Sequence, residues 1–396
     1  MKMGTLANRF ILVTVVVMAV WSSTARDTIF VMEVSNHGTS APKYAANPEY
    51  DVTKNNYSKS GQITSTGIRE MNENGKNFRK EYVDQQRFMP SNFDPESVNY
   101  YSILDQSSLM SAYSFNLGAY PDSVSYLEFT DGLSDNNAMS HEKQVRKALG
   151  LRETPSQAGA KKIPIKTNEG IMYWRDPNSQ CAPIGKKIQS NLGTASQSLD
   201  KTYRDSLFSQ LENKFGKTAN KLKFENTHYY LEDYLSAKAQ GASYPKFTNQ
   251  ASIDKMIEEY ERDYYYEGIL GGNHVSRVIS SPVLNYLLVT TFAKSETDKN
   301  KLNDSKYNKL KYAHFFADEV PFASILKTIG YPQGEAPKPG DTIKFELFTS
   351  DGKQFVRSSL NGKQMNFGGS NQGILEVDTF LKTIYPYLYF GNIDDV

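Results

Sequence analysis

Cysteine is almost absent from this chain, since Cys181 is the only one among 396 residues. A single thiol excludes an intramolecular disulfide, although secreted proteins often carry them. An excess of basic charge is also missing, because 45 lysines and arginines face 44 aspartates and glutamates. Nucleic acid is therefore not an expected partner. Stability must come from a packed core, for which this length is sufficient.

Long apolar runs are scarce, and the clearest one stands at the start of the chain. Lys2 and Arg9 accompany an apolar run of 12 residues from Phe10 to Trp21, and the small residues 23–25 follow it. This order is typical of a secretory signal peptide. We predict that residues 1–25 are removed, which leaves 43 basic and 44 acidic residues. The run is shorter than the roughly 20 residues that span a bilayer, so an uncleaved anchor is only the alternative.

The signal peptide predicts an address in the secretory pathway, either outside the cell or in a lysosome or digestive vacuole, with no membrane attachment after cleavage. Asn56 and Asn303 each begin an Asn-x-Ser triplet and are glycosylation candidates in that pathway, although such triplets also arise by chance.

The apolar pattern predicts an α/β fold. Continuous apolar runs are typical of buried parallel strands, and Asp351-Gly352 between two strand-like runs favours a hairpin. We predict a three-layer sandwich with a mostly parallel central sheet flanked by helices, made by residues 26–128 and 269–396, and an inserted helical cap at 129–268. The expected strands are 28–34, 98–103, 311–317, 342–349 and 354–360, and the expected helices are 64–82, 107–117, 198–215, 252–266 and 321–329.

His37 stands where the first predicted strand gives way to a polar loop, in the sequence Val34-Ser-Asn-His-Gly-Thr-Ser-Ala-Pro42. Open α/β sheets place their binding sites at the carboxyl ends of the strands, so we expect His37 to lie in a cleft. A loop histidine that is satisfied by hydrogen bonds is the alternative.

This stretch resembles the Arg-His-Gly-x-Arg-x-Pro signature of the histidine acid phosphatases, the acid phosphatase and phytase branch of the histidine phosphatase superfamily. Further stretches resemble later family segments in the right order between residues 29 and 362. They are Gly61-Gln62-Ile63-Thr64-x-x-Gly67, Gly75-Lys76-Asn77-Phe78-Arg79-Lys80-x-Tyr82, Ser107 to Ala112, Glu267-Gly268, Gly271-Gly272, Phe345-Glu346-Leu347, Val356-Arg357 and Asn361-Gly362.

In that family a histidine attacks phosphorus and arginines hold the phosphate. The resemblance puts His37 at the nucleophile position, but Asn36, Ser40 and Ser107 stand where arginines are expected. Arginine suits this task because its planar fork holds a permanent charge and forms two parallel hydrogen bonds. The three replacements bring no charge, so the resemblance implies a degenerate phosphate clamp.

The family also has a His-Asp pair between a strand and a helix, whose aspartate protonates the leaving group. Counting back from Gly330 puts Asp318 at the histidine position and Glu319 at the acid position. A carboxylate at 318 would repel phosphate, while Glu319 could still deliver a proton. A shifted register that uses His314 is the alternative. Both acids also precede a predicted helix, where acids are favoured by the helix dipole.

Two functions compete. The first is a secreted or vacuolar histidine acid phosphatase-like protein that is inactive or weakened and serves as a binding or structural protein. The second is an active acid phosphomonoesterase that works through a phosphohistidine at His37 with Glu319 as the proton donor. The ligand would be a small phosphorylated or other polar molecule, and a homodimer is compatible with either function.

The resemblance implies no cofactor and no metal ion. A third hypothesis differs, since His37, Asp318 and Glu319 could together surround a divalent cation. The tyrosines at 264–266 could line a groove of the cap, although packing is the simpler interpretation. Arg69, Arg79, Arg277, Lys217, Lys221 and Lys223 give no sign in the sequence of refilling the clamp.

Overall fold

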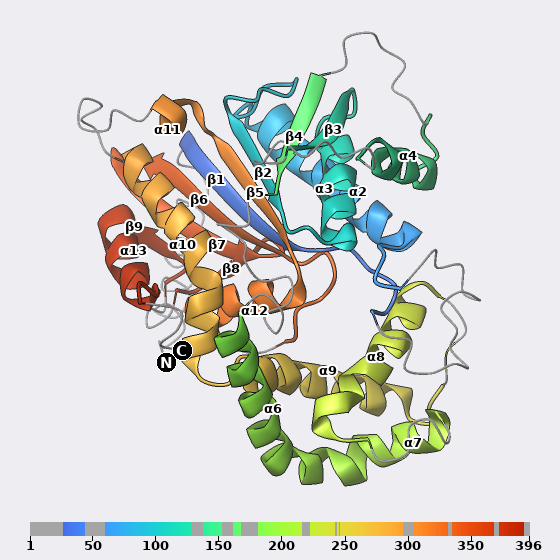
Figure 1. Ribbon diagram of the computed structural model, residues 1–396. Helices are drawn as coiled ribbons and strands as arrows, with labels where there is room; N and C mark the ends of the chain where they lie inside the picture. Colours follow the sequence, from blue (N-terminus) through green and yellow to red (C-terminus); the bar gives the residue numbers. More distant parts are fainter. Residues whose placement is uncertain are drawn as a thin grey trace, which may run out of the picture.

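The computed structural model describes residues 27–43, 60–128, 138–152, 161–167, 181–215, 222–241, 244, 246–295, 305–331, 335–367 and 372–391. A nine-stranded sheet forms its centre, and a helical body lies below one end of the strands (Figure 1). The predicted α/β sandwich is confirmed. In sheet order the strands are β3 (Ser123–Glu128), β4 (Lys161–Lys166), β2 (Val98–Ser102), β5 (Tyr312–Ala317), β1 (Asp27–Asn36), β6 (Thr342–Ser350), β7 (Lys353–Leu360) and β8 (Lys363–Met365), and β9 (Ile374–Glu376) also pairs with β7.

The sheet is mixed. The five strands from β3 to β1 run parallel to one another, whereas β6 to β9 pair antiparallel. The central strands β1 and β5 lie in register so that Asn36 is paired with Ala317. Both strands end at this level, and the register therefore brings the next residues, His37 and Asp318, to the same edge of the sheet.

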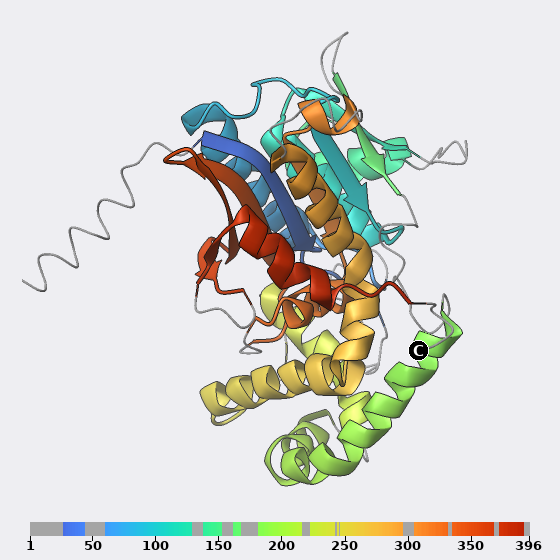
Figure 2. The same ribbon diagram turned by 90° about the vertical axis from the view of Figure 1, so that its left-hand side faces the viewer.

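Alternate residues of β1 enter two different cores, as the period of a strand requires. Met32 and Val34 pack in the core under α10 (Asn273–Ser295), α12 (Glu319–Thr328) and α13 (Val377–Ile384). Val31 packs in the core under α2 (Ser65–Phe78), α3 (Gln106–Ala119) and α4 (Ala138–Ala148). Figures 1 and 2 show the sheet between these two helical layers.

The helical body, here called the cap, has its own apolar core. Apolar side chains on its helices meet there, among them Leu207, Leu231, Ile257 and Tyr260. The cap consists of α6 (Ala182–Tyr203), the π-helical turn η3 (Arg204–Phe208), α7 (Ser209–Phe215), α8 (Phe224–Ala239), α9 (Gln250–Asp263) and the π-helical turn η5 (Tyr264–Ile269).

The predicted start of the cap at residue 129 was too early. The strand β4 lies in the central sheet between β3 and β2, and α4 packs against α2 and α3. The sequence Lys-Lys-Ile-Pro-Ile-Lys of β4 alternates only weakly and contains a proline, so its strand signal was missed. The cap helix predicted at 198–215 begins instead at Ala182, next to Pro183, and continues through η3 into α7.

The other predicted elements are present with shifted ends. The helix expected at 64–82 is α2 followed by the π-helical turn η2 (Arg79–Gln85), and the hairpin between β6 and β7 turns at Asp351 and Gly352, both with positive φ. The short helices α11 (Ser305–Lys309) and η6 (Tyr385–Tyr387) complete the described elements.

Three sequence predictions lie outside the described residues, namely the signal peptide at 1–25 and the glycosylation candidates Asn56 and Asn303. Within the described ranges, no helix has the length and apolar character needed to cross a membrane.

The helices α2 and α3 touch through their backbones. A Cβ atom on Gly75 would lie 2.0 Å from the carbonyl oxygen of Phe115, and one on Gly118 would lie 2.1 Å from that of Asn72. Asn72 also donates a side-chain hydrogen bond to the carbonyl of Ser114 (3.0 Å). The close approach therefore depends on two glycines, one on each helix.

We expect Gly118→Ala to lower the free energy of unfolding by about 2 kcal/mol, because overpacking a rigid contact forces the two backbones apart. Chemical denaturation followed by circular dichroism measures this change. Gly193→Ala in α6 is the control, since no other heavy atom lies within 4 Å of the added Cβ. It should stabilise the protein by up to about 1 kcal/mol, and equal midpoints for the two variants would refute the close-packing argument.

Candidate functional site at the carboxyl edge of the sheet

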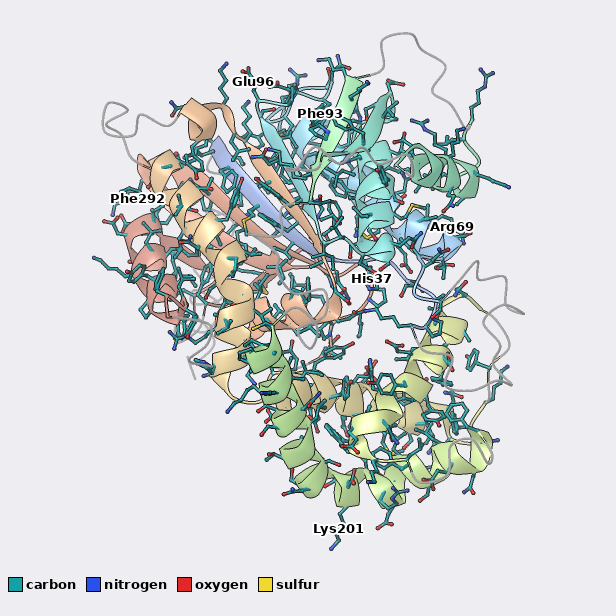
Figure 3. The ribbon with its side chains drawn as sticks, in the orientation of Figure 1. His37, Arg69, Phe93, Glu96, Lys201 and Phe292 are labelled. Carbon is teal, nitrogen blue, oxygen red and sulfur yellow. The ribbon has the colours of Figure 1, made fainter. Side chains whose placement is uncertain are left out.

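His37 is buried at the junction between the sheet and the cap (Figure 3). Its backbone N–H donates to the carbonyl of Ala317 (3.0 Å), which continues the pairing of β1 with β5 for one residue. The next N–H, of Gly38, donates to the hydroxyl of Ser111 on α3 (3.0 Å). The loop after β1 is thus fixed on both sides, and so is the imidazole it carries.

The two glycines of the family-like motifs meet at this point. A Cβ on Gly38 would lie 2.5 Å from the carbonyl oxygen of Gly67, and a Cβ on Gly67 would lie 2.3 Å from that of Thr39. Any larger residue at either position would push the loop away from the start of α2. These glycines therefore position His37 and do not themselves bind a ligand.

The imidazole of His37 is held in one orientation. Its Nδ1 lies 2.9 Å from the carbonyl oxygen of Gly38, so Nδ1–H is the donor. The other nitrogen, Nε2, lies 3.6 Å from Asp318 Oδ1 and 3.3 Å from Glu319 Oε1. Neither contact has hydrogen-bond geometry, and Nε2 finds no hydrogen-bond partner within the described part of the chain. The nitrogen that would act as a nucleophile therefore faces two carboxylates.

Asp318 caps the helix α12 and also binds a lysine. Its carboxylate accepts the backbone N–H of Glu319 (Oδ1, 2.8 Å) and the ammonium group of Lys43 (Oδ2, 2.7 Å). Lys43 Nζ also lies 3.8 Å from Glu319 Oε2. The predicted helix-capping role of Asp318 and its place in the pocket therefore coexist.

The charges in this cluster stabilise one another. Burial alone would raise the pKa of Asp318, but Lys43 and His37 hold that pKa well below its ordinary value. Burial opposes the charged form of Lys43, yet Asp318 raises the pKa of the ammonium group above its usual value. The pKa of His37 is also raised, because the attraction of Asp318 exceeds the effect of burial. Lys43 is thus a fully charged lysine already committed to the two acids.

The three residues at the expected arginine positions contact mainly protein atoms. Asn36 donates to the carbonyl of Lys338 (3.0 Å), and Ser107 donates to the carboxylate of Asp105, which caps α3. Ser40 lines the cavity, and its carbonyl accepts a hydrogen bond from Ser236 of the cap (2.7 Å). None of the three supplies a cation to the pocket.

A cavity of about 550 Å³ lies between the loop after β1 and the cap, and Glu319 reaches it, whereas the buried His37 and Asp318 are not among its lining residues. Carboxylates dominate its charged lining, and no arginine is among its lining residues in the described ranges. The acids are Glu70, Glu232, Glu258, Glu261, Glu319 and Glu335, and the bases are Lys43, Lys238, Lys338 and His228. All three lysines form ion pairs with acids. A dianionic phosphate would therefore enter a site of unfavourable sign.

The cap contributes a second buried ionic cluster. His228 Nδ1 lies 3.0 Å from Glu261, and its Nε2 lies 3.5 Å from Glu232. Glu232 in turn accepts the backbone N–H of Lys43 (3.2 Å). Burial disfavours the imidazolium form of His228, but Glu261 and Glu232 raise its pKa to about 10. The cluster therefore links the cap to the loop that carries the site.

Sequence reasoning missed Lys43 and the His228 cluster. Lys43 directly follows the Pro42 of the opening motif, and that position was the available signal for it. His228 and Glu232 stand one helical turn apart on α8, a spacing that could have shown their contact, whereas Glu261 joins them only when α9 packs against α8. Of the predicted cap tyrosines, Tyr265 lines the cavity, whereas Tyr264 stacks on His228 and Tyr266 is buried in the cap core.

The other basic residues named in the sequence lie elsewhere. Arg69 is exposed on α2, away from His37 (Figure 3), Arg79 donates to the carbonyl of Ala119, and Arg277 binds carbonyls near the C-terminus. Lys223 is the N-cap residue of α8, and Lys217 and Lys221 lie outside the described residues.

His314 does not join the site. It lies inside the sheet on β5, where its Nε2 is 2.8 Å from the hydroxyl of Ser35 and its Nδ1 is 2.9 Å from that of Tyr312. Burial holds the pKa of His314 well below its ordinary value. The register with Asp318 beside His37 is therefore the one that the structure adopts.

Solved structures with a similar fold include phytases and a related phosphatase. The apo phytase of Hafnia alvei matches with a TM-score of 0.59 at 14% identity, over 92% of this chain and 97% of that one. The phosphate complex of multiple inositol polyphosphate phosphatase from Bifidobacterium longum matches with a TM-score of 0.56 at 12% identity, over 94% and 96%. No known family model and no curated protein matches the sequence. The resemblance to histidine acid phosphatases is confirmed for the fold.

The cap cluster predicts a pH dependence of stability. The pKa of His228 rises from about 6.5 in the unfolded chain to about 10, so its contribution is complete below pH 6.5 and is lost as the pH rises through 10. We expect His228→Gln to remove a pH-dependent part of the unfolding free energy, of the order of a few kcal/mol. Denaturation curves between pH 6 and 10.5 measure it.

Glu261→Gln is the matched control for this prediction, because it keeps the imidazole and removes one of the charges that holds its proton. It should flatten the same pH profile in part. The assignment fails if wild type and His228→Gln lose stability in parallel between pH 7 and 10.

Proposed function

We propose that this chain is a histidine acid phosphatase-like protein of the secretory pathway, secreted or vacuolar, whose site no longer hydrolyses phosphomonoesters and serves to bind a ligand. One observation carries the proposal. Glu319 Oε1 stands 3.3 Å from Nε2 of His37, in the range of distances at which an attacked atom would have to lie. The place of the phosphoryl group is thus bordered by two carboxylates, and the nearest lysine is already paired.

The fold supports a phosphatase-like origin of the site, and the charges around His37 support ligand binding without phosphate hydrolysis. An intact pocket needs several fixed positive donors around the phosphate oxygens, and losing one oxyanion donor typically costs about 10² to 10³ in rate. Here Asn36, Ser40 and Ser107 offer none of that charge, and Asp318 adds an opposing one. The acidic cavity favours a polar ligand that carries no net negative charge.

An active acid phosphomonoesterase is the second candidate, and one feature favours it. Nδ1 of His37 is anchored on a carbonyl, which leaves Nε2 with the lone pair that a phosphohistidine mechanism requires. Glu319 also lies close enough to protonate a leaving group. This candidate needs unpaired positive charge, whereas Lys43, Lys238, Lys338 and His228 of the cavity lining are each paired with an acid.

We expect the purified chain to hydrolyse an aryl phosphate between about pH 4 and 6 no faster than its His37→Ala variant. The physical reason is the repulsion between phosphate and the acidic pocket. Steady-state assays at saturating aryl phosphate, with equal concentrations of the two proteins, measure the difference. Turnover that disappears in His37→Ala would establish the phosphomonoesterase and overturn the proposal.

Restoring the clamp should restore anion binding. We expect the combined variant Asn36→Arg, Ser40→Arg, Ser107→Arg and Asp318→His to bind inorganic phosphate in calorimetric titrations in which the wild type shows no heat of binding. Asp318→Asn alone is the control, because it releases Lys43 without adding an arginine. If the combined variant folds, as judged by its melting curve, and still ignores phosphate, the placement of the pocket is wrong.

A further inference from the structure

Three ligand-type atoms converge behind the wall of the cavity, to which Glu319 belongs. Nε2 of His37, a carboxylate oxygen of Asp318 and one of Glu319 all lie within 4.8 Å of one another. His37 and Asp318 are buried, and Glu319 is largely covered but reaches the cavity. Nε2 is a buried polar atom with no hydrogen bond from the described residues, and it points at the two acids.

The separations fit a metal ion better than they fit hydrogen bonds. Bonds of about 2.0 to 2.2 Å in a tetrahedral site place neighbouring ligand atoms about 3.3 to 3.6 Å apart. Nε2 lies 3.3 Å from Glu319 Oε1 and 3.6 Å from Asp318 Oδ1. A direct N–H···O hydrogen bond would bring the atoms to about 2.7 to 3.2 Å.

The groups around these atoms are those that orient metal ligands. A histidine that binds a metal usually donates its other N–H to a carbonyl or carboxylate, and Nδ1 of His37 lies 2.9 Å from the carbonyl of Gly38. Ligating carboxylates are held by hydrogen bonds of their own. Lys43 binds Oδ2 of Asp318 and lies nearest Oε2 of Glu319. Oδ1 of Asp318 accepts the backbone N–H of Glu319 and keeps a second lone pair, so this oxygen and Oε1 of Glu319 can face an ion beside His37.

We propose that His37, Asp318 and Glu319 form a binding site for one divalent transition-metal ion of the Zn²⁺ class. One nitrogen and two carboxylate oxygens are ligands that such ions accept, whereas Mg²⁺ and Ca²⁺ prefer oxygen alone. Lys43 offsets one of the two negative charges, and the acidic cavity attracts cations. A fourth position would face the cavity, where a water molecule or a polar ligand could bind.

This inference rests on the proposed function, because a single Nε2 cannot both hold an ion and attack phosphorus. It departs from the expectation that the site uses no metal. It also names a class of ligand, a cation, that needs neither the expected arginines nor the histidine expected at the position of Asp318. The carboxylates that repel phosphate attract a cation.

The test is a calorimetric titration of the untagged, chelator-treated chain with Zn²⁺, with Mg²⁺ in parallel. We expect one Zn²⁺ per chain and much weaker binding of Mg²⁺. His37→Ala, Asp318→Asn and Glu319→Gln should each weaken Zn²⁺ binding at least about 100-fold, since even the loss of a group behind the ligands typically costs 10- to 100-fold. Visible absorption of the Co²⁺ form should report a tetrahedral ion in the wild type only.

A control separates this site from general attraction by the cavity. Glu258→Gln removes a cavity acid from α9 that does not contact His37, Asp318 or Glu319, and it should bind Zn²⁺ within a few-fold of the wild type. Loss of binding in Glu258→Gln, or binding that survives in His37→Ala, overturns the assignment. The two conservative carboxylate variants keep the test valid if His37→Ala does not fold.

The outcomes also distinguish this inference from the proposed function. If the chain neither binds Zn²⁺ nor shows phosphatase turnover that depends on His37, the metal site is refuted. The proposal of a binding protein is unaffected by that outcome. Phosphatase turnover without metal that depends on His37 would refute both the metal site and the binding-protein proposal.

Discussion

The ion pair between Lys43 and Asp318 is the contact on which the candidate site depends. It joins the loop after β1 to the start of α12, and the backbone N–H of the same lysine reaches Glu232 in the cap. Asp318 is buried, so loss of its partner would leave an uncompensated charge in the interior, which typically costs several kcal/mol. Lys43, which contacts both the core and the cap, is therefore not free to bind a phosphate.

Packing explains part of the family-like motifs. Gly38 and Gly67 are required by the close backbone contact between the loop after β1 and the start of α2. Asn36 and Ser107, at positions where arginines were expected, donate hydrogen bonds to protein groups. The glycines therefore follow from the fold alone, whereas the residues at the arginine positions bring no charge to the site.

The sequence predicted most reliably what is local. Strand β1, helix α3 and the Asp351-Gly352 hairpin follow from apolar spacing and turn chemistry, and the position of His37 at a strand end follows from β1 alone. The predicted boundary of the cap was wrong because β4 is short and contains Pro164. The ionic partners of the site were missed for another reason. Lys43 meets Glu232 and Asp318 across 189 and 275 residues of chain, and His228 meets Glu261 across 33, so the contacts depend on tertiary packing.

The charges in and around the candidate site agree in sign. Asn36, Ser40 and Ser107 bring no charge to the positions where arginines were expected, and Asp318 and Glu319 place two carboxylates beside one paired lysine. Glu70, Glu232 and Glu261 extend the same sign across the cavity wall. Because Coulomb interactions in a partly buried site act over several ångströms, the charge of the wall and the charge of the site favour the same kind of ligand. In the proposed metal site, His37 would offer Nε2 to the cation after that nitrogen has lost its proton.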